Sequence, residues 1–156
     1  MKVYLSIVFG FKITGKENVP KAGPVIVVAN HASAFDPIAL GCACPRQINF
    51  MAKAELFDNP ISASFLRRLH AFPVRRGRVD REAYRQSMDI LKAGEVLGMF
   101  PEGTRSATGE LQGAHPGAAR FAIPTGQPIG PAAVVGTISK HRKGMRGLRE
   151  RPVSVV

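Results

Sequence analysis

Residues 25–37 read VIVVANHASAFDP, and this stretch decides how we interpret the rest of the chain. Its first five residues form a continuous apolar, largely β-branched run, which is typical of a strand covered on both faces in a mainly parallel sheet. Asp36 and Pro37 then read as a helix N-cap followed by a proline in the first turn. We therefore place His31 just past the carboxyl end of a strand and Asp36 at the start of the next helix.

His31 and Asp36 are the first candidates for chemistry. On one continuous helix their spacing would turn the two side chains about 140° apart, so they meet only if the chain bends between them. A carboxylate that holds one imidazole nitrogen raises the basicity of the other, which supplies a base and its orienting group without a serine or cysteine nucleophile. Taken singly, the histidine also fits a packed or surface residue, and the aspartate fits a simple cap.

Composition limits the class of protein and its partners. The 156 residues are 45% hydrophobic, which predicts one domain over residues 1–156 with a single core. The formal net charge of +11 indicates an anionic partner: nucleic acid, a membrane surface, or an acidic or phosphorylated substrate. Cys42 and Cys44 read as small core residues in a reducing compartment, and no cluster of metal ligands is visible. No signal peptide or spanning segment is recognisable, so a role at a membrane would be peripheral.

Basic residues gather in two clusters. The first cluster contains Arg67, Arg68, Arg75, Arg76, Arg78, Arg81 and Arg85. The second cluster contains Lys140, Arg142, Lys143, Arg146, Arg149 and Arg151. Each cluster also fits a solvated surface.

Strands and helices alternate along the chain, which predicts an α/β fold with a mixed, largely parallel sheet flanked by helices. Strands are expected at residues 12–15, 25–29, 48–52, 72–74, 95–100, 129–135 and 153–156. Helices are expected at residues 37–44, 53–57, 62–69, 80–93 and 116–124. Residues 1–11 fit a strand, a frayed start or an interfacial helix. Ligands of such sheets bind beyond the carboxyl ends of the strands, so the active site is expected there.

A second stretch that carries candidate functional side chains, FPEGTRS, occupies residues 100–106. Gly103 permits a close backbone approach, and Arg105 carries a planar fork suited to phosphate. Glu102 fits two roles, holding Arg105 in place or accepting a hydrogen bond from a substrate hydroxyl, and a plain ion pair that stiffens the loop is the simpler alternative. Arg75 and Arg76 read either as a phosphate clamp or as surface charge.

These motifs together resemble the glycerolipid acyltransferase family, whose best-known members are bacterial 1-acylglycerol-3-phosphate acyltransferases. The resemblance rests on Asn30-His31-x4-Asp36, on residues 100–106 and on residues 72–76, and it runs from about Gly15 to the C-terminus. It implies that His31 is the general base on the acceptor hydroxyl and that Asp36 orients it. The residues that it assigns to the acceptor phosphate are Arg76, Glu102, Gly103 and Arg105, with Asn30, Arg75, Thr104 and Pro131 in support.

The reaction implied by the resemblance moves a fatty acyl group from an acyl-thioester to the sn-2 hydroxyl of 1-acylglycerol-3-phosphate, giving phosphatidic acid. It needs no cofactor or metal, and the co-substrate is acyl-CoA or an acyl carrier protein (acyl-ACP). The expected partners are an anionic membrane surface, the lysophospholipid acceptor and the acyl donor, without nucleic acid. The expected location is peripheral, on the cytoplasmic face of the membrane. Lys2, Phe9 and Phe11 would add an interfacial anchor.

The chain departs from the family pattern at several places. Ala114-His115 stands where a Phe-Lys pair is common. Gly130 replaces a bulkier residue that is often seen in the weaker fourth motif, residues 126–135, which is linked to the acyl donor. Family members usually continue past Val156, so we expect this domain to lack that extension. The motifs do not specify an oligomeric state.

Three alternative functions stay open. One is the same chemistry on another acceptor, such as glycerol-3-phosphate or a lyso-aminolipid. Another is a lipid-binding protein without catalysis. The last is a nucleic-acid-binding module, although the second basic cluster has no aromatic platforms between its cations.

Overall fold

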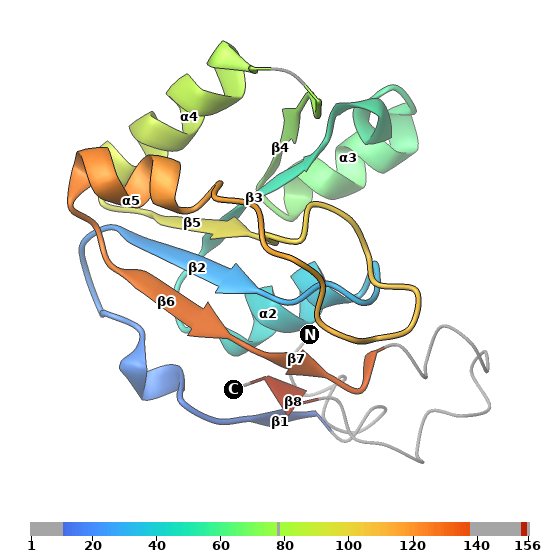
Figure 1. The fold of residues 1–156 in the computed structure, drawn as a ribbon, viewed down its shortest axis with the longest axis vertical. Helices are drawn as coiled ribbons and strands as arrows, with labels where there is room; N and C mark the ends of the chain where they lie inside the picture. Colours follow the sequence, from blue (N-terminus) through green and yellow to red (C-terminus); the bar gives the residue numbers. More distant parts are fainter. Residues whose placement is uncertain (1–10, 78, 138–153, 156) are drawn as a thin grey trace.

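The computed structural model describes residues 11–77, 79–137 and 154–155 of the chain. Its main sheet has five parallel strands in the order β4-β3-β5-β2-β6 (Figure 1). These strands are β2 (Val25–Ala29), β3 (Ile48–Lys53), β4 (Ala71–Val74), β5 (Val96–Met99) and β6 (Ile129–Ala132). A smaller mixed sheet contains β1 (Lys12–Ile13), β8 (Ser154–Val155) and β7 (Val134–Val135). The predicted α/β fold with a mixed, largely parallel sheet is confirmed.

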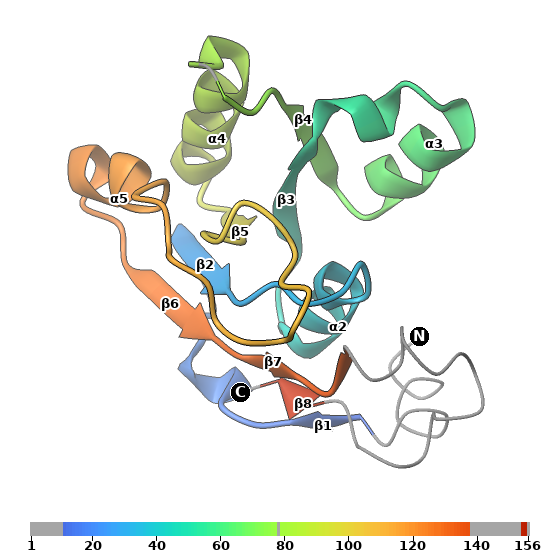
Figure 2. The same ribbon diagram turned by 45° about the vertical axis from the view of Figure 1, so that its right-hand side comes forward.

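Helices cover both faces of the main sheet (Figures 1 and 2). They are α2 (Asp36–Ala43), α3 (Pro60–Arg68), α4 (Arg81–Lys92) and α5 (Ala119–Thr125), with two 3-10 helices, η1 (Lys16–Asn18) and η2 (Ala54–Phe57). Val25 and Val27 pack in one core cluster with α2, whereas Ile26 packs in the other with α4 and α5. This alternation explains the continuous apolar run, because both faces of β2 are buried.

Strand β5 lies between β2 and β3 and pairs with both. Val96 is aligned with Val25 on one side and with Ile48 on the other. Because all five strands are parallel, their carboxyl ends meet at one edge of the sheet. The segments that leave this edge follow β2 at Asn30, β3 at Ala54, β4 at Arg75 and β5 at Phe100, and together with the strand ends they supply the candidate site.

Gly98 on β5 permits the close packing of this strand against β3. A Cβ atom at position 98 would overlap Ile48 Cγ2 and would lie 2.9 Å from two atoms of the Phe50 ring. Both neighbours are buried in the core. We therefore expect Gly98→Ala to lower the free energy of unfolding by about 1–3 kcal/mol, because the core has no room for the added methyl group.

Urea unfolding followed by circular dichroism measures this effect. Gly113→Ala is the matched control, since a Cβ atom there meets nothing within 4 Å and the change in unfolded-chain entropy is the same. If Gly98→Ala unfolded at the same urea concentration as the control, the proposed steric conflict at β5 would be wrong.

Several expectations about individual residues need correction. Asp36 is the first residue of α2 and the N-cap is Phe35, without a side-chain capping bond, so the assignment of Asp36 as N-cap is wrong. Phe11 is buried in the core, which excludes it as an interfacial anchor. The strand expected at 129–135 is divided between β6 and β7, which belong to different sheets. Pro131 lies in β6, an edge strand of the main sheet, which is where a sheet tolerates proline.

Other expectations fall outside the described residues. These are the fold of residues 1–10 with the anchor residues Lys2 and Phe9, the position of Arg78, the whole second basic cluster, and residues 153 and 156. Cys44 is buried in the core and Cys42 is half-buried and packs against it, which fits their prediction as core residues.

Candidate active site

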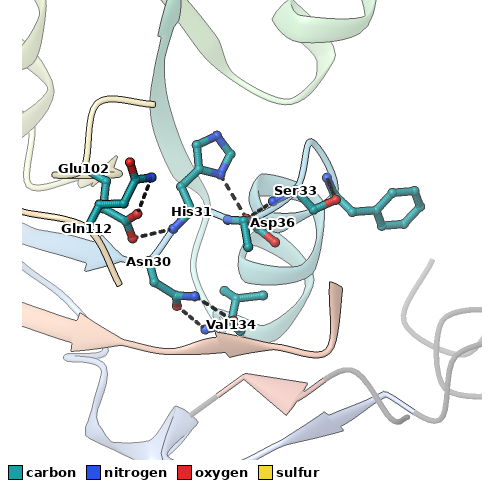
Figure 3. A network of polar contacts seen from close by, with 9 residues as sticks. Asn30, His31, Ser33, Asp36, Glu102, Gln112 and Val134 are labelled. Carbon is teal, nitrogen blue, oxygen red and sulfur yellow. Dashed lines mark hydrogen bonds and ion pairs between the residues drawn. The ribbon is translucent and has the colours of Figure 1, made fainter. Parts of the chain in front are cut away.

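The imidazole of His31 and the carboxylate of Asp36 meet at the carboxyl end of β2. His31 Nδ1 lies 2.9 Å from Asp36 Oδ2, and the Asp36 side chain is fully buried (Figure 3). The chain turns between the two residues through a bend that ends where α2 begins. The predicted meeting of these side chains is therefore present in the structure.

The hydrogen bonds of Asp36 determine which imidazole nitrogen carries the proton. Asp36 Oδ2 also accepts from the backbone N–H groups of Ala32 at 2.6 Å and Ser33 at 2.7 Å. An ionised carboxylate is an acceptor only, so the neutral imidazole must carry its proton on Nδ1. Nε2 then holds a free electron pair and is directed away from Asp36 (Figure 3). This is the arrangement that a general base requires.

The backbone of His31 is held by the loop that follows β5. The His31 N–H donates to Glu102 Oε1 at 2.9 Å, and the Ser106 N–H donates to the His31 carbonyl at 2.8 Å. The second oxygen of Glu102 accepts from Gln112 Nε2 at 3.2 Å (Figure 3). His31 is thereby joined at both backbone groups to residues 102–106, which lie within the FPEGTRS motif.

Two further contacts fix the surroundings of His31. The His31 and Phe100 rings are stacked with their centroids 4.2 Å apart, and the Phe100 ring is in turn stacked on Phe50 at 6.1 Å. The side-chain amide of Asn30 forms two hydrogen bonds with the backbone of Val134, which resemble the pairing of a neighbouring strand. Its oxygen accepts from the Val134 N–H, and its NH₂ group donates to the Val134 carbonyl. The residues on either side of the strand-to-loop junction are therefore fixed by packing and by hydrogen bonds.

A cavity of about 1080 Å³ opens at this edge of the sheet, and His31 lies on its wall. Its wall carries cationic side chains and apolar side chains together. The cations are Lys53, Arg76, Arg81, Arg105 and Arg120. The apolar residues include Met51, Leu56, Val74, Met99 and Phe121. Such a wall suits a ligand that has an anionic group and a hydrocarbon chain.

The structure brings only some of the predicted residues to this cavity. Arg76, Gly103, Thr104 and Arg105 line it together with His31, whereas Asn30, Arg75, Glu102 and Pro131 do not. Gly103 has a φ of 69°, which favours glycine. A Cβ atom there would come within 3.2 Å of the His115 ring, so the absence of a side chain also leaves room for this histidine.

The interactions of Glu102 and Arg75 differ from the simplest expectations. The Glu102 carboxylate is buried and forms no ion pair with Arg105, because its oxygens accept from His31 and Gln112. Arg75 contributes its backbone, whose N–H donates to Asp80 Oδ2 at 2.8 Å. This bond and that from the Ala83 N–H lower the pKa of Asp80, so the carboxylate that caps α4 is ionised at neutral pH.

Sequence reasoning missed several residues of the cavity wall. Lys53 is the last residue of β3, so the rule that ligands bind beyond strand ends could have identified it. Arg120 belongs to α5, where no sequence signal marks it, whereas the sequence marks Arg81 only as a member of the first basic cluster and His115 only as a departure from the family pattern. Tyr84 on α4 also lines the cavity, where its partly exposed ring stacks on Phe121.

The described part of the chain contains no group of three or more His, Cys, Asp or Glu residues arranged to hold a metal ion. The chemistry that the cavity offers through its own side chains is proton transfer by His31 and anion binding by the arginines.

Comparison with known proteins identifies the family. A profile described as Acyltransferase matches residues 10–135. The chain belongs to the acyltransferase family. The resemblance seen in the sequence motifs is confirmed, and the chain is a member of an enzyme family.

Named relatives give the same picture for this acyltransferase. It is 39% identical over 140 residues to the 1-acyl-sn-glycerol-3-phosphate acyltransferase of Bacillus subtilis, which covers 89% of this chain and 69% of that protein. It is 32% identical over 129 residues to the protein of the same name from Borreliella burgdorferi, covering 80% of this chain and 51% of that protein.

A solved structure is also similar to this acyltransferase. The crystal structure of the 1-acyl-sn-glycerophosphate acyltransferase PlsC from Thermotoga maritima superimposes with a TM-score of 0.72 at 29% identity. The match covers 99% of this chain and 66% of the other. The chain therefore spans about two thirds of the length of the relatives from Bacillus subtilis and Thermotoga maritima and about half the length of the one from Borreliella burgdorferi.

Proposed function

We propose that this acyltransferase transfers a fatty acyl group from an acyl-thioester to the sn-2 hydroxyl of 1-acylglycerol-3-phosphate, which yields phosphatidic acid. The observation that carries the proposal is His31, held at Nδ1 by the buried Asp36, on the wall of a cavity that is both cationic and apolar. The names of the relatives from Bacillus subtilis and Thermotoga maritima support this acceptor.

The chemical steps follow from the position of His31. Nε2 takes the proton of the acceptor hydroxyl as its oxygen attacks the thioester carbonyl. The tetrahedral intermediate then collapses, the C–S bond breaks, and the imidazolium returns the proton to the leaving thiolate. General-base assistance of this kind is worth roughly 10²–10⁴-fold in rate, and the ionised Asp36 stabilises the imidazolium that forms. The protein forms no covalent intermediate in this sequence.

The cavity wall suggests how the acceptor is oriented. Arg76 and Arg105 carry planar guanidinium groups suited to the two oxygens of a phosphate, and Thr104 beside them offers a hydroxyl. Met51, Val74 and Met99 provide apolar surface for an acyl chain. The donor in this proposal is acyl-CoA or acyl-ACP, and both present the same thioester to His31.

Thioester turnover tests the function directly. Purified protein is supplied with palmitoyl-CoA in detergent micelles and with either 1-acylglycerol-3-phosphate or glycerol-3-phosphate. Thiol release that requires the lyso-phosphatidate, with phosphatidic acid as the lipid product, is the expected result. Release with glycerol-3-phosphate but not with 1-acylglycerol-3-phosphate would show that the acceptor is glycerol-3-phosphate. If palmitoyl-CoA gave no release with either acceptor, acyl-ACP would replace it, and failure with both donors would contradict acyl transfer.

We further propose that the enzyme works as a peripheral protein on an anionic bilayer, at the cytoplasmic face. None of the helices in the described residues is long and apolar enough to span a membrane. The η2–α3 segment carries Leu56, Ile61 and Phe65, which are all exposed, and α3 ends with Arg67 and Arg68. Exposed apolar side chains beside cations are the combination that binds the surface of an anionic membrane.

Replacing Ile61 tests this surface. Ile61 is 83% exposed on α3, and Ile123 on α5 is its matched control at 81% exposure. The two helices lie at opposite sides of the ribbon in Figures 1 and 2. We expect Ile61→Ser to weaken binding to phosphatidylglycerol vesicles about tenfold in a sedimentation assay, because burial of an isoleucine side chain contributes about 1.5 kcal/mol or more. Ile123→Ser should bind like the wild type. Equal binding of the two variants would contradict a membrane contact at α3.

A further inference from the structure

The backbone of His31 lies between two parts of one loop. Its N–H and its carbonyl are bonded to Glu102 and to Ser106, respectively. His31 lies two residues beyond Ala29, the last residue of β2, where regular pairing with the neighbouring strands has ended. The Glu102 carboxylate therefore accepts the His31 N–H, as a backbone carbonyl of a neighbouring strand does for residues within the sheet.

The two oxygens of Glu102 are both occupied. Oε1 accepts from the His31 N–H at 2.9 Å and Oε2 accepts from Gln112 Nε2 at 3.2 Å (Figure 3). The side chain is only 5% exposed, and it does not line the cavity. A buried carboxylate facing a phosphate would repel it, whereas a carboxylate that accepts two N–H groups is stabilised where it lies.

We propose that Glu102 and Gln112 are positioning residues that act through His31, with the Glu102 carboxylate fixing the His31 backbone and Gln112 fixing the carboxylate. The Glu102–Gln112 clamp, as we call these two side chains, sets the direction from which the imidazole enters the cavity. This assigns Glu102 a different role from the phosphate binding that the family resemblance implies, and it adds Gln112, which no motif marks.

The clamp has a kinetic consequence that rests on the proposed acyl transfer. A base displaced by about 1 Å loses roughly 100-fold in rate, because the reacting atoms no longer reach their near-attack geometry. Substrate affinity does not depend on that displacement when the arginines of the cavity are unchanged. Loss of the clamp should therefore lower kcat and leave KM for the acceptor unchanged, whereas loss of a group that binds the acceptor equally in the ground and transition states raises KM.

Kinetics of five variants and one control test the clamp. We expect Glu102→Ala to lower kcat roughly 100-fold, and Gln112→Ala, at an exposed position that does not threaten folding, to lower it less. Glu102→Gln retains more activity than Glu102→Ala, because an amide oxygen still accepts from His31. The double variant Glu102→Gln/Gln112→Glu exchanges donor and acceptor across the 3.2 Å contact and should recover activity relative to Gln112→Glu alone. Glu110→Gln, in the same exposed loop, is the control for removing one carboxylate.

Amide hydrogen exchange tests the clamp without any turnover. In ¹⁵N-labelled protein, the His31 amide should exchange slowly in the wild type and in Glu102→Gln, and faster in Glu102→Ala. Equal protection in all three proteins would overturn the clamp. A rise in KM with unchanged kcat in Glu102→Ala would overturn its kinetic role and favour direct acceptor binding. If the wild type shows no acyl transfer but its His31 amide depends on Glu102, the proposed function fails and the clamp stands.

Discussion

His31→Ala is expected to reduce thioester-dependent acyl transfer by at least roughly 10²–10⁴-fold, the contribution of general-base catalysis. The substitution removes the group that accepts the hydroxyl proton, and no second histidine contacts Asp36 in the described residues. Thiol release from palmitoyl-CoA in the presence of 1-acylglycerol-3-phosphate measures the effect. Thermal unfolding should change little, since Asp36 keeps its two backbone donors.

The control for this prediction is another histidine. His70→Asn removes an exposed imidazole whose backbone has a φ of 55°, a conformation that asparagine tolerates. It should retain wild-type turnover. Unchanged turnover in His31→Ala would exclude His31 as the base and would direct attention to His115, the other histidine on the cavity wall.

Asp36→Asn is expected to fold and yet to lose roughly 10³–10⁴-fold in kcat. All three of its donors converge on Oδ2, while Oδ1 is buried and accepts no hydrogen bond from the described residues. An asparagine with its oxygen at the Oδ2 position keeps these bonds, and its buried NH₂ group lowers the free energy of unfolding by about 1–3 kcal/mol. The neutral amide no longer stabilises the imidazolium, which accounts for the loss of rate.

Two comparisons make this second prediction specific. Asp36→Ala removes the acceptor for the part-buried N–H of Ala32 and the buried N–H of Ser33, so it should unfold at lower temperature than Asp36→Asn. Asp89→Asn, on the exposed face of α4, is the control for loss of a negative charge. Wild-type kcat in Asp36→Asn would mean that the charge of Asp36 contributes nothing to catalysis.

Local patterns predicted the elements but not their order. The strand at 25–29 follows from five consecutive apolar residues, and the structure has the same bounds. The insertion of β5 between β2 and β3 depends on contacts between distant segments. Gly98 illustrates this point, because its missing side chain makes room for Ile48 and Phe50, which lie about fifty residues earlier in the chain. The sequence alone does not indicate that Gly98 faces these two residues.

The candidate site shows the same division. The meeting of His31 and Asp36 could be predicted because it needs only a bend within a short segment. The direction of the Asp36 hydrogen bonds could not, since a carboxylate at a helix start can accept from the helix or from the preceding loop. The bond between His31 and Glu102 joins residues 71 positions apart, and only the assembled sheet brings them together.

The position of β5 also bears on how a ribosome-bound chain acquires its structure. Synthesis releases β2 and β3 first, but these strands do not pair with each other, and the edge of each strand that faces β5 has no partner until Val96–Met99 emerges. At about 5–20 residues per second, the interval lasts for seconds, during which two strand edges remain open to association with other chains. The segment that closes this gap is followed directly by the loop that holds His31. The nascent protein therefore gains its reactive centre only once β5 has covered the facing edges of β2 and β3.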